Sequence, residues 1–148
     1  MPPSEHLYHA TVSWKEKKKG VIAFHDEQTP PIEVAVAPEF FGHRHIASPE
    51  ELFVASVASC HMAYFLGVAE KMRVKFEAYT CHATGILSPA GMDYVFTSID
   101  LDIVIAISEE RHRHKTERAL ALAHKGCFVA HSIRPEVRMH ATINVKDT

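Results

Sequence analysis

Apolar and polar residues alternate along the first quarter of the chain with a period of two, which predicts β-strands. The alternation covers three segments, residues 7–14, 21–26 and 32–36. Gly20 supplies a turn between the first two, and Pro30-Pro31 breaks the chain before the third. We therefore expect an antiparallel three-stranded meander, followed by an irregular loop over residues 38–47.

A long apolar segment then begins with a strong helix-start signal. Ser48 suits the N-cap, Pro49 suits the first helical position, and Glu51 completes a capping box. The stretch Leu52–Ala69 contains no Asp, Glu, Lys or Arg, and we expect the helix to continue to about Met72. At ~27 Å this stretch could barely span a bilayer. Because polar residues interrupt it, the pattern favours a buried central helix or an interface helix.

The second half of the chain mixes strands and helices. We expect strands over residues 73–87, 92–107 and 136–145, a helix from Ser108 to Gly126, and a short helix over residues 127–133. In the second of these strands, apolar residues lie on one face, and Asp100 and Asp102 lie on the other. The order of elements predicts a single α+β domain over residues 1–148, without βαβ units.

Composition and charge exclude several classes of protein. The net charge is −2 and no long basic block occurs, so we expect no nucleic-acid binding. The first twenty residues lack the apolar region of a secretory signal. We therefore expect a cytoplasmic protein, without a membrane span, whose three cysteines are reduced thiols. HExxH and CxxC motifs are absent, and we expect no cofactor.

Cys60 lies inside the apolar helix, and Cys127 follows Gly126 at the start of a short helix. A free thiol has a pKa of ~8.5, and apolar burial alone would raise this value and reduce reactivity. A reactive thiol therefore needs a nearby cation or a helix N-terminus. For Cys60 the candidate cations are Arg44, the lysine run at 17–19 and His61, although the His61 side chain points ~100° away on a helix.

Two alternatives to a reactive thiol remain open for these cysteines. Each of them could be a small core residue, since free cysteine is among the most buried residue types. Cys81 alternates with its neighbours in a strand, and we interpret it as an ordinary strand residue. A metal site formed by His124, Cys127 and His131 is an alternative, although a fourth ligand is not evident.

Two segments together resemble the OsmC/Ohr family of thiol-dependent hydroperoxide reductases. They are SPEELFVASVASCHM, in which Glu50 and Cys60 keep the family interval, and AHKGCFVAHSI, which contains Cys127. The resemblance implies a peroxidatic Cys60, a resolving Cys127 and a polar partner role for Glu50. It also implies an OsmC-like fold in an intertwined homodimer with two sites at the subunit interface. Members usually reduce organic hydroperoxides better than hydrogen peroxide, and some take electrons from lipoylated proteins.

The chain departs from the family pattern at two places. Phe128 follows the second cysteine where proline is common, and the early segment KEKKKG has no arginine to contact the thiolate. Lys17, Lys18, Lys19 or Arg44 could substitute, but a lysine lacks the planar fork of arginine.

The proposed chemistry makes two geometric demands. Glu50 and Cys60 lie ~15 Å apart along one straight helix, so Glu50 would serve Cys60 of another subunit unless the helix bends. The Cα atoms of Cys60 and Cys127 must come within ~7 Å for a disulfide. An external dithiol would then reduce that disulfide.

Apolar residues around Cys60 could bind the organic tail of a hydroperoxide, or they could simply form the core. They are Phe53, Val57, Met62, Tyr64 and Phe65. Two other functions therefore remain as alternatives to the peroxidase. One is a non-catalytic protein of the same fold that binds a small ligand, and the other is a metal-binding domain.

Overall fold

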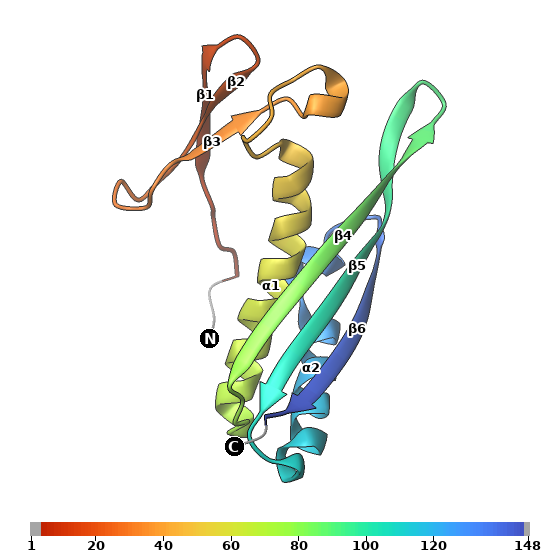
Figure 1. The fold of residues 1–148 in the computed structure, drawn as a ribbon. Helices are drawn as coiled ribbons and strands as arrows, with labels where there is room; N and C mark the ends of the chain where they lie inside the picture. The colour runs from red at the N-terminus through yellow and green to blue at the C-terminus, as the bar shows by residue number, and fades with distance from the viewer. Residues whose placement is uncertain (1–3, 147–148) are drawn as a thin grey trace. The chain divides into compact units, whose positions relative to one another are not determined.

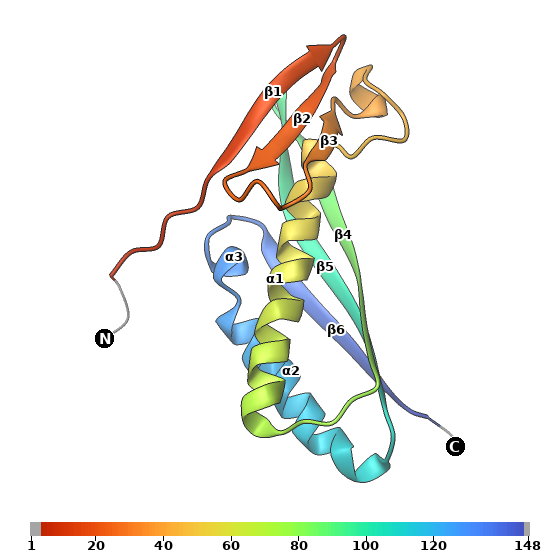
Figure 2. The same cartoon turned by 90° about the vertical axis from the view of Figure 1, so that its left-hand side faces the viewer.

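The computed structural model describes residues 4–146 of the chain. These residues form two compact units, residues 4–52 and 53–146, with the boundary in the first turn of helix α1 (Pro49–Met72). Figures 1 and 2 show the elements of both units. The single domain expected over residues 1–148 stays a prediction, and we describe each unit by itself.

The first unit contains the expected antiparallel meander. Its strands are β1 (Ala10–Glu16), β2 (Lys19–Phe24) and β3 (Ile32–Ala35), in the order β1-β2-β3. Trp14 pairs with Gly20, and Lys17 takes a left-handed conformation, with φ of 50°, in the turn between β1 and β2. The short 3-10 helix η1 (Pro38–Phe40) lies within the segment expected to be a loop.

The predicted capping box starts helix α1. The Ser48 hydroxyl accepts a hydrogen bond from the Glu51 backbone N–H at 3.2 Å, and Glu51 Oε1 accepts one from the Ser48 backbone N–H at 3.0 Å. Two backbone donors at the helix end are thereby satisfied by side chains. The helix ends at Met72, as expected, and Arg73 follows with φ of 56°. The N–H of Val74 then reaches back to the Ala69 carbonyl at 2.8 Å, which closes the helix end.

Only one stripe of α1 is buried, at a spacing of four residues: Val57, His61, Phe65 and Ala69. Other apolar side chains of the helix remain exposed, including Met62 at 39% and Leu66 at 43%. This is the one described helix that is long and apolar enough to cross a membrane, and 22% of that apolar stretch is buried. We expected the central helix to be buried. Within a single chain, only this stripe of the helix is buried.

The second unit is built on a sheet of three strands, β4 (Ala78–Ala90), β5 (Asp93–Ile107) and β6 (Glu136–Val145). In Figures 1 and 2 the strands lie side by side, and α1 and α2 (Arg113–Gly126) lie on the same face of the sheet. The pair β4–β5 is antiparallel, as expected. The pair β5–β6 is parallel, which corrects the expectation of antiparallel sheets without βαβ units. The direction follows from the crossover through α2 between these strands.

Alternating side chains of β5 build the centre of the core. Five of them are at most 1% exposed: Ile99, Leu101, Ile103, Ile105 and Ile107. Asp100 and Asp102 lie on the opposite face, as predicted, and Asp100 forms an ion pair of 2.8 Å with Arg138 of β6. The second face of the sheet is therefore polar, whereas the first face packs against helices.

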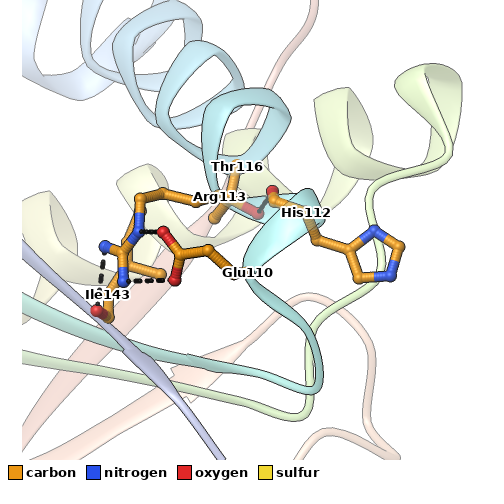
Figure 3. A network of polar contacts seen from close by, with 5 residues as sticks. All are labelled: Glu110, His112, Arg113, Thr116 and Ile143. Atoms are coloured by element: carbon orange, nitrogen blue, oxygen red, sulfur yellow. Dashed lines mark hydrogen bonds and ion pairs between the residues drawn. The ribbon is translucent and has the colours of Figure 1, made fainter.

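Helix α2 begins later than expected. Ser108 does not cap it; the 3-10 turn η2 (Glu110–His112) precedes it, and no side chain caps its N-terminus. Instead, Arg113 joins the helix start to β6, as Figure 3 shows. Its guanidinium donates to the Ile143 carbonyl at 3.1 Å and to both carboxylate oxygens of Glu110 at 2.6 and 3.1 Å. A bidentate arginine thus fixes the start of the crossover.

Candidate active site

Cys60 and Cys127, which the sequence analysis paired, are brought together in the second unit. Cys60 lies half-buried on α1, and Cys127 is 2% exposed in the extended link between α2 and α3 (Phe128–His131). The Cys60 side chain lies close enough to raise the pKa of the Cys127 thiol, and both are free cysteines. Long-range packing thus places two sulfurs 67 positions apart in the sequence next to each other.

The Cys127 thiol is held in its protonated form. Burial, together with a smaller effect of the neighbouring Cys60 side chain, raises its pKa to about 11. The backbone N–H groups of Ala130 and Val129, at the start of α3, oppose this by donating to the sulfur. Burial prevails, so the predicted helix start at Cys127 does not produce a thiolate in the reduced protein.

An aromatic pair covers the link that carries Cys127. Tyr64 of α1 packs edge-on against Phe128, with ring centroids 5.7 Å apart, and Phe128 is 72% exposed. Tyr64 also lies against Gly126, where a Cβ atom would come within 2.7 Å of its hydroxyl oxygen. The close approach of α1 to the end of α2 therefore requires glycine at this position.

A buried polar pair, which no sequence pattern indicated, lies beside the thiols. His61 is 0% exposed, and its Nδ1 lies 2.7 Å from the Tyr79 hydroxyl of β4. Burial and the nearby charge of His124 lower the pKa of His61 to about 4. Burial raises the pKa of Tyr79, and the charges of Cys81 and Cys127 raise it further. Both side chains are therefore neutral near pH 7, which excludes His61 as the cation beside Cys60.

The remaining polar candidates belong to the first unit. Arg44 is exposed in the loop before α1, and Glu50 is half-buried in the first turn of the helix. Two lysines of the run make local contacts: Lys18 Nζ donates to the Phe41 carbonyl at 3.0 Å, and Lys19 lies 3.3 Å from Glu16. The roles of Arg44 and Glu50 stay predictions.

The apolar candidates separate into two groups. Val57 is 0% exposed and lies in the core, so its side chain offers no surface to a ligand in this structure. Phe53 is half-buried and packs against Phe96 with the rings tilted and their centroids 4.8 Å apart, and Tyr64 is half-buried near Cys127. Phe53 and Tyr64 therefore have surface that a ligand could contact.

Among residues 4–146, no three His, Cys, Asp or Glu side chains are grouped so that they could hold a metal ion. The alternative of a metal site at His124, Cys127 and His131 is therefore wrong. Cys127 has an extended conformation, with ψ of 112°, which separates the helix of His124 from that of His131. The three side chains consequently do not share one helical face.

The third cysteine lies on the inner side of β4. Cys81 is half-buried, packs against the core, and pairs with Ile103 across the sheet. Burial raises the pKa of its thiol, and the charge of Asp102 raises it further. These observations fit the interpretation of Cys81 as an ordinary strand residue.

Thiol–disulfide chemistry requires two neighbouring sulfurs, and Cys60 and Cys127 lie close enough to interact. Cys60 is partly open to solvent, whereas Cys127 is enclosed beside it. An oxidised Cys60 would therefore meet a second thiol before a larger reagent could reach that thiol. The apolar surroundings exclude water from the inner sulfur.

Comparison with known proteins gives the relationships of the chain. Residues 42–142 match the OsmC-like protein family. No curated protein matches the sequence. An OsmC-like protein of unknown function from Vibrio cholerae is 28% identical, with a TM-score of 0.82 over 93% of this chain and 100% of that chain.

Two more distant structures share the fold. The organic hydroperoxide resistance protein OsmC from Legionella pneumophila is 20% identical, with a TM-score of 0.68 over 95% of this chain and 100% of that chain. An organic hydroperoxide resistance protein from Elizabethkingia anophelis is 17% identical, with a TM-score of 0.70 over 96% and 99% of the two chains. Together with the match over most of its length, these likenesses show that the chain belongs to the OsmC-like family.

Proposed function

We propose that the protein is a thiol peroxidase that reduces organic hydroperoxides, with Cys60 as the peroxidatic and Cys127 as the resolving cysteine. One observation carries the proposal: a half-buried thiol and an enclosed thiol lie close enough to interact. Membership of the OsmC-like family supports it, as do relatives in the fold named as organic hydroperoxide resistance proteins.

The first half of the reaction oxidises Cys60. Its thiolate attacks the terminal oxygen of the hydroperoxide, the O–O bond breaks, and the leaving alkoxide takes a proton to become the alcohol. Cys60 is then a sulfenic acid. The Cys127 sulfur attacks it, an S–S bond forms, and the Cys60 S–O and Cys127 S–H bonds break with release of water.

The second half restores the two thiols. An external dithiol exchanges with the Cys60–Cys127 disulfide and leaves as its own cyclic disulfide, so two electrons and two protons enter the protein. A lipoylated protein is the candidate reductant. Because both thiols must be reduced again after each turnover, the reaction suits the cytoplasm.

The organic part of the substrate would contact the aromatic side chains beside the cysteines. Tyr64 and Phe53 are half-buried and Phe128 is largely exposed, so each can lose apolar surface to a ligand. Burying a group of phenyl size is worth ~2 kcal/mol. We therefore expect kcat/KM for cumene hydroperoxide to exceed that for hydrogen peroxide by at least ~10-fold.

A second copy of the chain would complete the site. The first unit supplies Glu50 and the cation Arg44, and we propose that in a homodimer these side chains serve Cys60 of the partner. The exposed apolar residues Met62 and Leu66 of α1 support this proposal, because a helix with such a surface suits an interface.

Turnover with cumene hydroperoxide and dihydrolipoamide tests the function. We expect Cys60→Ser to lose activity completely, because the attacking sulfur is absent. Cys127→Ser should complete the first oxidation and then accumulate the sulfenic acid, which a dimedone adduct detects by mass spectrometry. Cys81→Ser is the matched control and should turn over at the wild-type rate.

Two results would contradict the peroxidase. Equal slow peroxide consumption by wild type, Cys60→Ser and Cys127→Ser would favour the small-ligand-binding protein. A disulfide that links Cys60 to Cys81 in peptide maps of the oxidised protein would move the resolving role away from Cys127.

A further inference from the structure

The segment that carries Cys127 is short and has little secondary structure of its own. It consists of Cys127, in an extended conformation with φ of −62° and ψ of 112°, and the four residues of α3. Figure 2 shows α3 at the far end of α2. No side chain caps the N-terminus of α3. Because a single helical turn is not stable by itself, tertiary contacts must hold Cys127 in place.

Tyr64 of α1 makes such contacts on both sides of Cys127. Before the cysteine, the tyrosine ring lies against Gly126, where an added Cβ atom would be 2.7 Å from the Tyr64 hydroxyl oxygen and closer still to the ring carbons. After the cysteine, the ring packs edge-on against Phe128, with centroids 5.7 Å apart and planes at 89°. Both sequence neighbours of Cys127 therefore contact one side chain of α1.

The same side chain lies one helical turn from Cys60. Cys60 and Tyr64 both belong to α1, and residues four positions apart lie on one face of an α-helix. Long side chains of a helix lean toward its N-terminus, which directs the Tyr64 ring toward the turn of Cys60. The contacts of Tyr64 thus bring the Cys127 segment to the part of α1 that carries Cys60.

A tyrosine opposite a glycine suits this contact by its shape. The ring is rigid and has only two side-chain torsions, so ordering it costs little conformational entropy. Gly126 lets the ring approach the backbone without a Cβ atom between them. Edge-on aromatic pairs such as Tyr64 and Phe128 are favourable beyond the area that they bury.

We propose that Tyr64 is a positioning residue that holds Cys127 against Cys60 for the disulfide-forming step. The inference rests on the proposed function, because it concerns the resolving step of that reaction. In this role Tyr64 acts through the backbone on either side of Cys127.

Position matters because the sulfenic acid of Cys60 has two competing fates. In the first, the Cys127 sulfur attacks it, an S–S bond forms, and the sulfenic oxygen leaves as water with the thiol proton. In the second, another hydroperoxide gives up an oxygen to the sulfur, its O–O bond breaks, and a sulfinic acid and an alcohol result. The first step is intramolecular, so its rate depends on how closely the two sulfurs are held.

The test follows the resolving step by itself. Reduced wild type, Tyr64→Ala and Tyr64→Phe receive one equivalent of hydrogen peroxide, which has no organic part for the ring to contact. Samples are quenched with dimedone, and mass spectrometry measures the sulfenic acid and the Cys60–Cys127 disulfide over time. Disulfide formation should be about 10- to 100-fold slower in Tyr64→Ala, because misplaced reacting groups lose rate on this scale. Tyr64→Phe keeps the ring and should restore the rate.

Further comparisons separate positioning from a general loss of stability. In Tyr64→Ala, oxidation of Cys60 should stay within about threefold of the wild-type rate, because that step does not involve the Cys127 segment. Val68→Ala is the matched control, since Val68 packs on the core one turn farther along α1, and its resolving step should match wild type. If Tyr64→Ala fails to fold, Gly126→Ala displaces the ring and should slow the same step.

A second measurement does not depend on peroxide. Equilibration with oxidised and reduced glutathione gives the effective concentration of the Cys127 thiol at Cys60. We expect this concentration to be lower by about 10-fold in Tyr64→Ala than in wild type, and unchanged in Val68→Ala.

The outcomes distinguish the two proposals. Disulfide formation in Tyr64→Ala at the wild-type rate overturns the positioning role and leaves the peroxidase intact. Equal slowing in Val68→Ala, or in Tyr64→Phe, would also overturn it, because neither variant removes the ring contacts. If peroxide does not oxidise Cys60 while the glutathione equilibrium shows the expected loss, the peroxidase fails and the positioning role stands. If neither peroxide nor oxidised glutathione forms a Cys60–Cys127 disulfide in wild type, both proposals are wrong.

Discussion

A single buried side chain, His61, makes the free energy of unfolding depend on pH. Its imidazole is 0% exposed, and only one of its two nitrogens has a hydrogen-bond partner. Burial and the charge of His124 lower its pKa from 6.5 to about 4. The folded protein therefore binds the proton of this group less readily than the unfolded chain does.

The sign of the pH dependence follows from this lowered pKa. Above pH 6.5 the imidazole is neutral in both states, and the folded state is fully stable with respect to this group. As the pH falls from 6.5 toward 4, the unfolded chain takes up the proton first, so the free energy of unfolding decreases. The whole shift is worth at most about 3 kcal/mol.

Urea unfolding between pH 7 and pH 4 measures this loss. We expect His61→Asn to show a flatter profile over that interval, because the amide does not titrate. His140→Asn changes an exposed histidine and should keep the wild-type slope. A wild-type profile that is flat between pH 6.5 and pH 4 would show that His61 titrates normally.

The sequence indicated the two candidate cysteines but not the buried pair beside them. Cys60 and Cys127 lie in motifs that resemble a family, and those motifs carry the prediction. Tyr79 was visible only as an alternating strand residue, and His61 only as a neighbour of Cys60. Their hydrogen bond depends on how α1 packs on β4, which no local pattern encodes.

At the scale of elements, the capping box decides where α1 begins. Ser48 is 2% exposed, and its hydroxyl accepts from the Glu51 N–H at 3.2 Å while lying 3.1 Å from the Glu51 carboxylate. Ser48→Ala leaves that donor unsatisfied, and we expect the free energy of unfolding to fall by about 1 kcal/mol. Chemical denaturation measures the change.

Replacement of Ser48 by related residues checks the mechanism. Ser48→Thr keeps the hydroxyl and should lose less than half of that stability. An equal loss in Ser48→Thr and Ser48→Ala would indicate that packing, and not capping, makes Ser48 important.

Gly126 controls the junction of α1 with the end of α2. A Cβ at this position would overlap the Tyr64 ring. Gly126→Ala must displace that ring, and we expect a net loss of about 1–2 kcal/mol, since strain outweighs the better helix propensity of alanine. In a double-mutant cycle, Tyr64→Leu should remove most of this penalty. Additive effects in the cycle would show that Tyr64 is not the obstacle.

Elements with local signals were predicted well, and those set by distant partners were not. The capping box predicted the start of α1, and alternation predicted β5 and β6. The direction of β6 was not predicted, because its parallel pairing with β5 depends on how the crossover packs. The start of α2 was also missed, because Arg113 binds Glu110 and β6 in place of a capping side chain.

At the scale of the whole molecule, the α+β fold could be expected from the order of elements together with the two cysteine motifs. The structural likeness to the Vibrio cholerae protein, with a TM-score of 0.82, agrees with that expectation. The exposed side of α1 could not be foreseen in the same way. Its residues are as apolar as those of the buried stripe, so the sequence alone does not distinguish a core helix from an interface helix.

That exposed side leads to the prediction of a homodimer. We expect wild type to sediment as a dimer at micromolar concentration, and Met62→Glu/Leu66→Glu to sediment as a monomer. Two carboxylates buried in an apolar interface cost several kcal/mol, which weakens association by at least about 100-fold. Leu122→Glu places one such carboxylate on α2, where Leu122 is 45% exposed, and should remain dimeric. A monomeric wild type would refute the dimer, and with it the proposal that Glu50 and Arg44 act on the partner's cysteine. Dissociation by Leu122→Glu but not by the α1 variant would place the interface on α2.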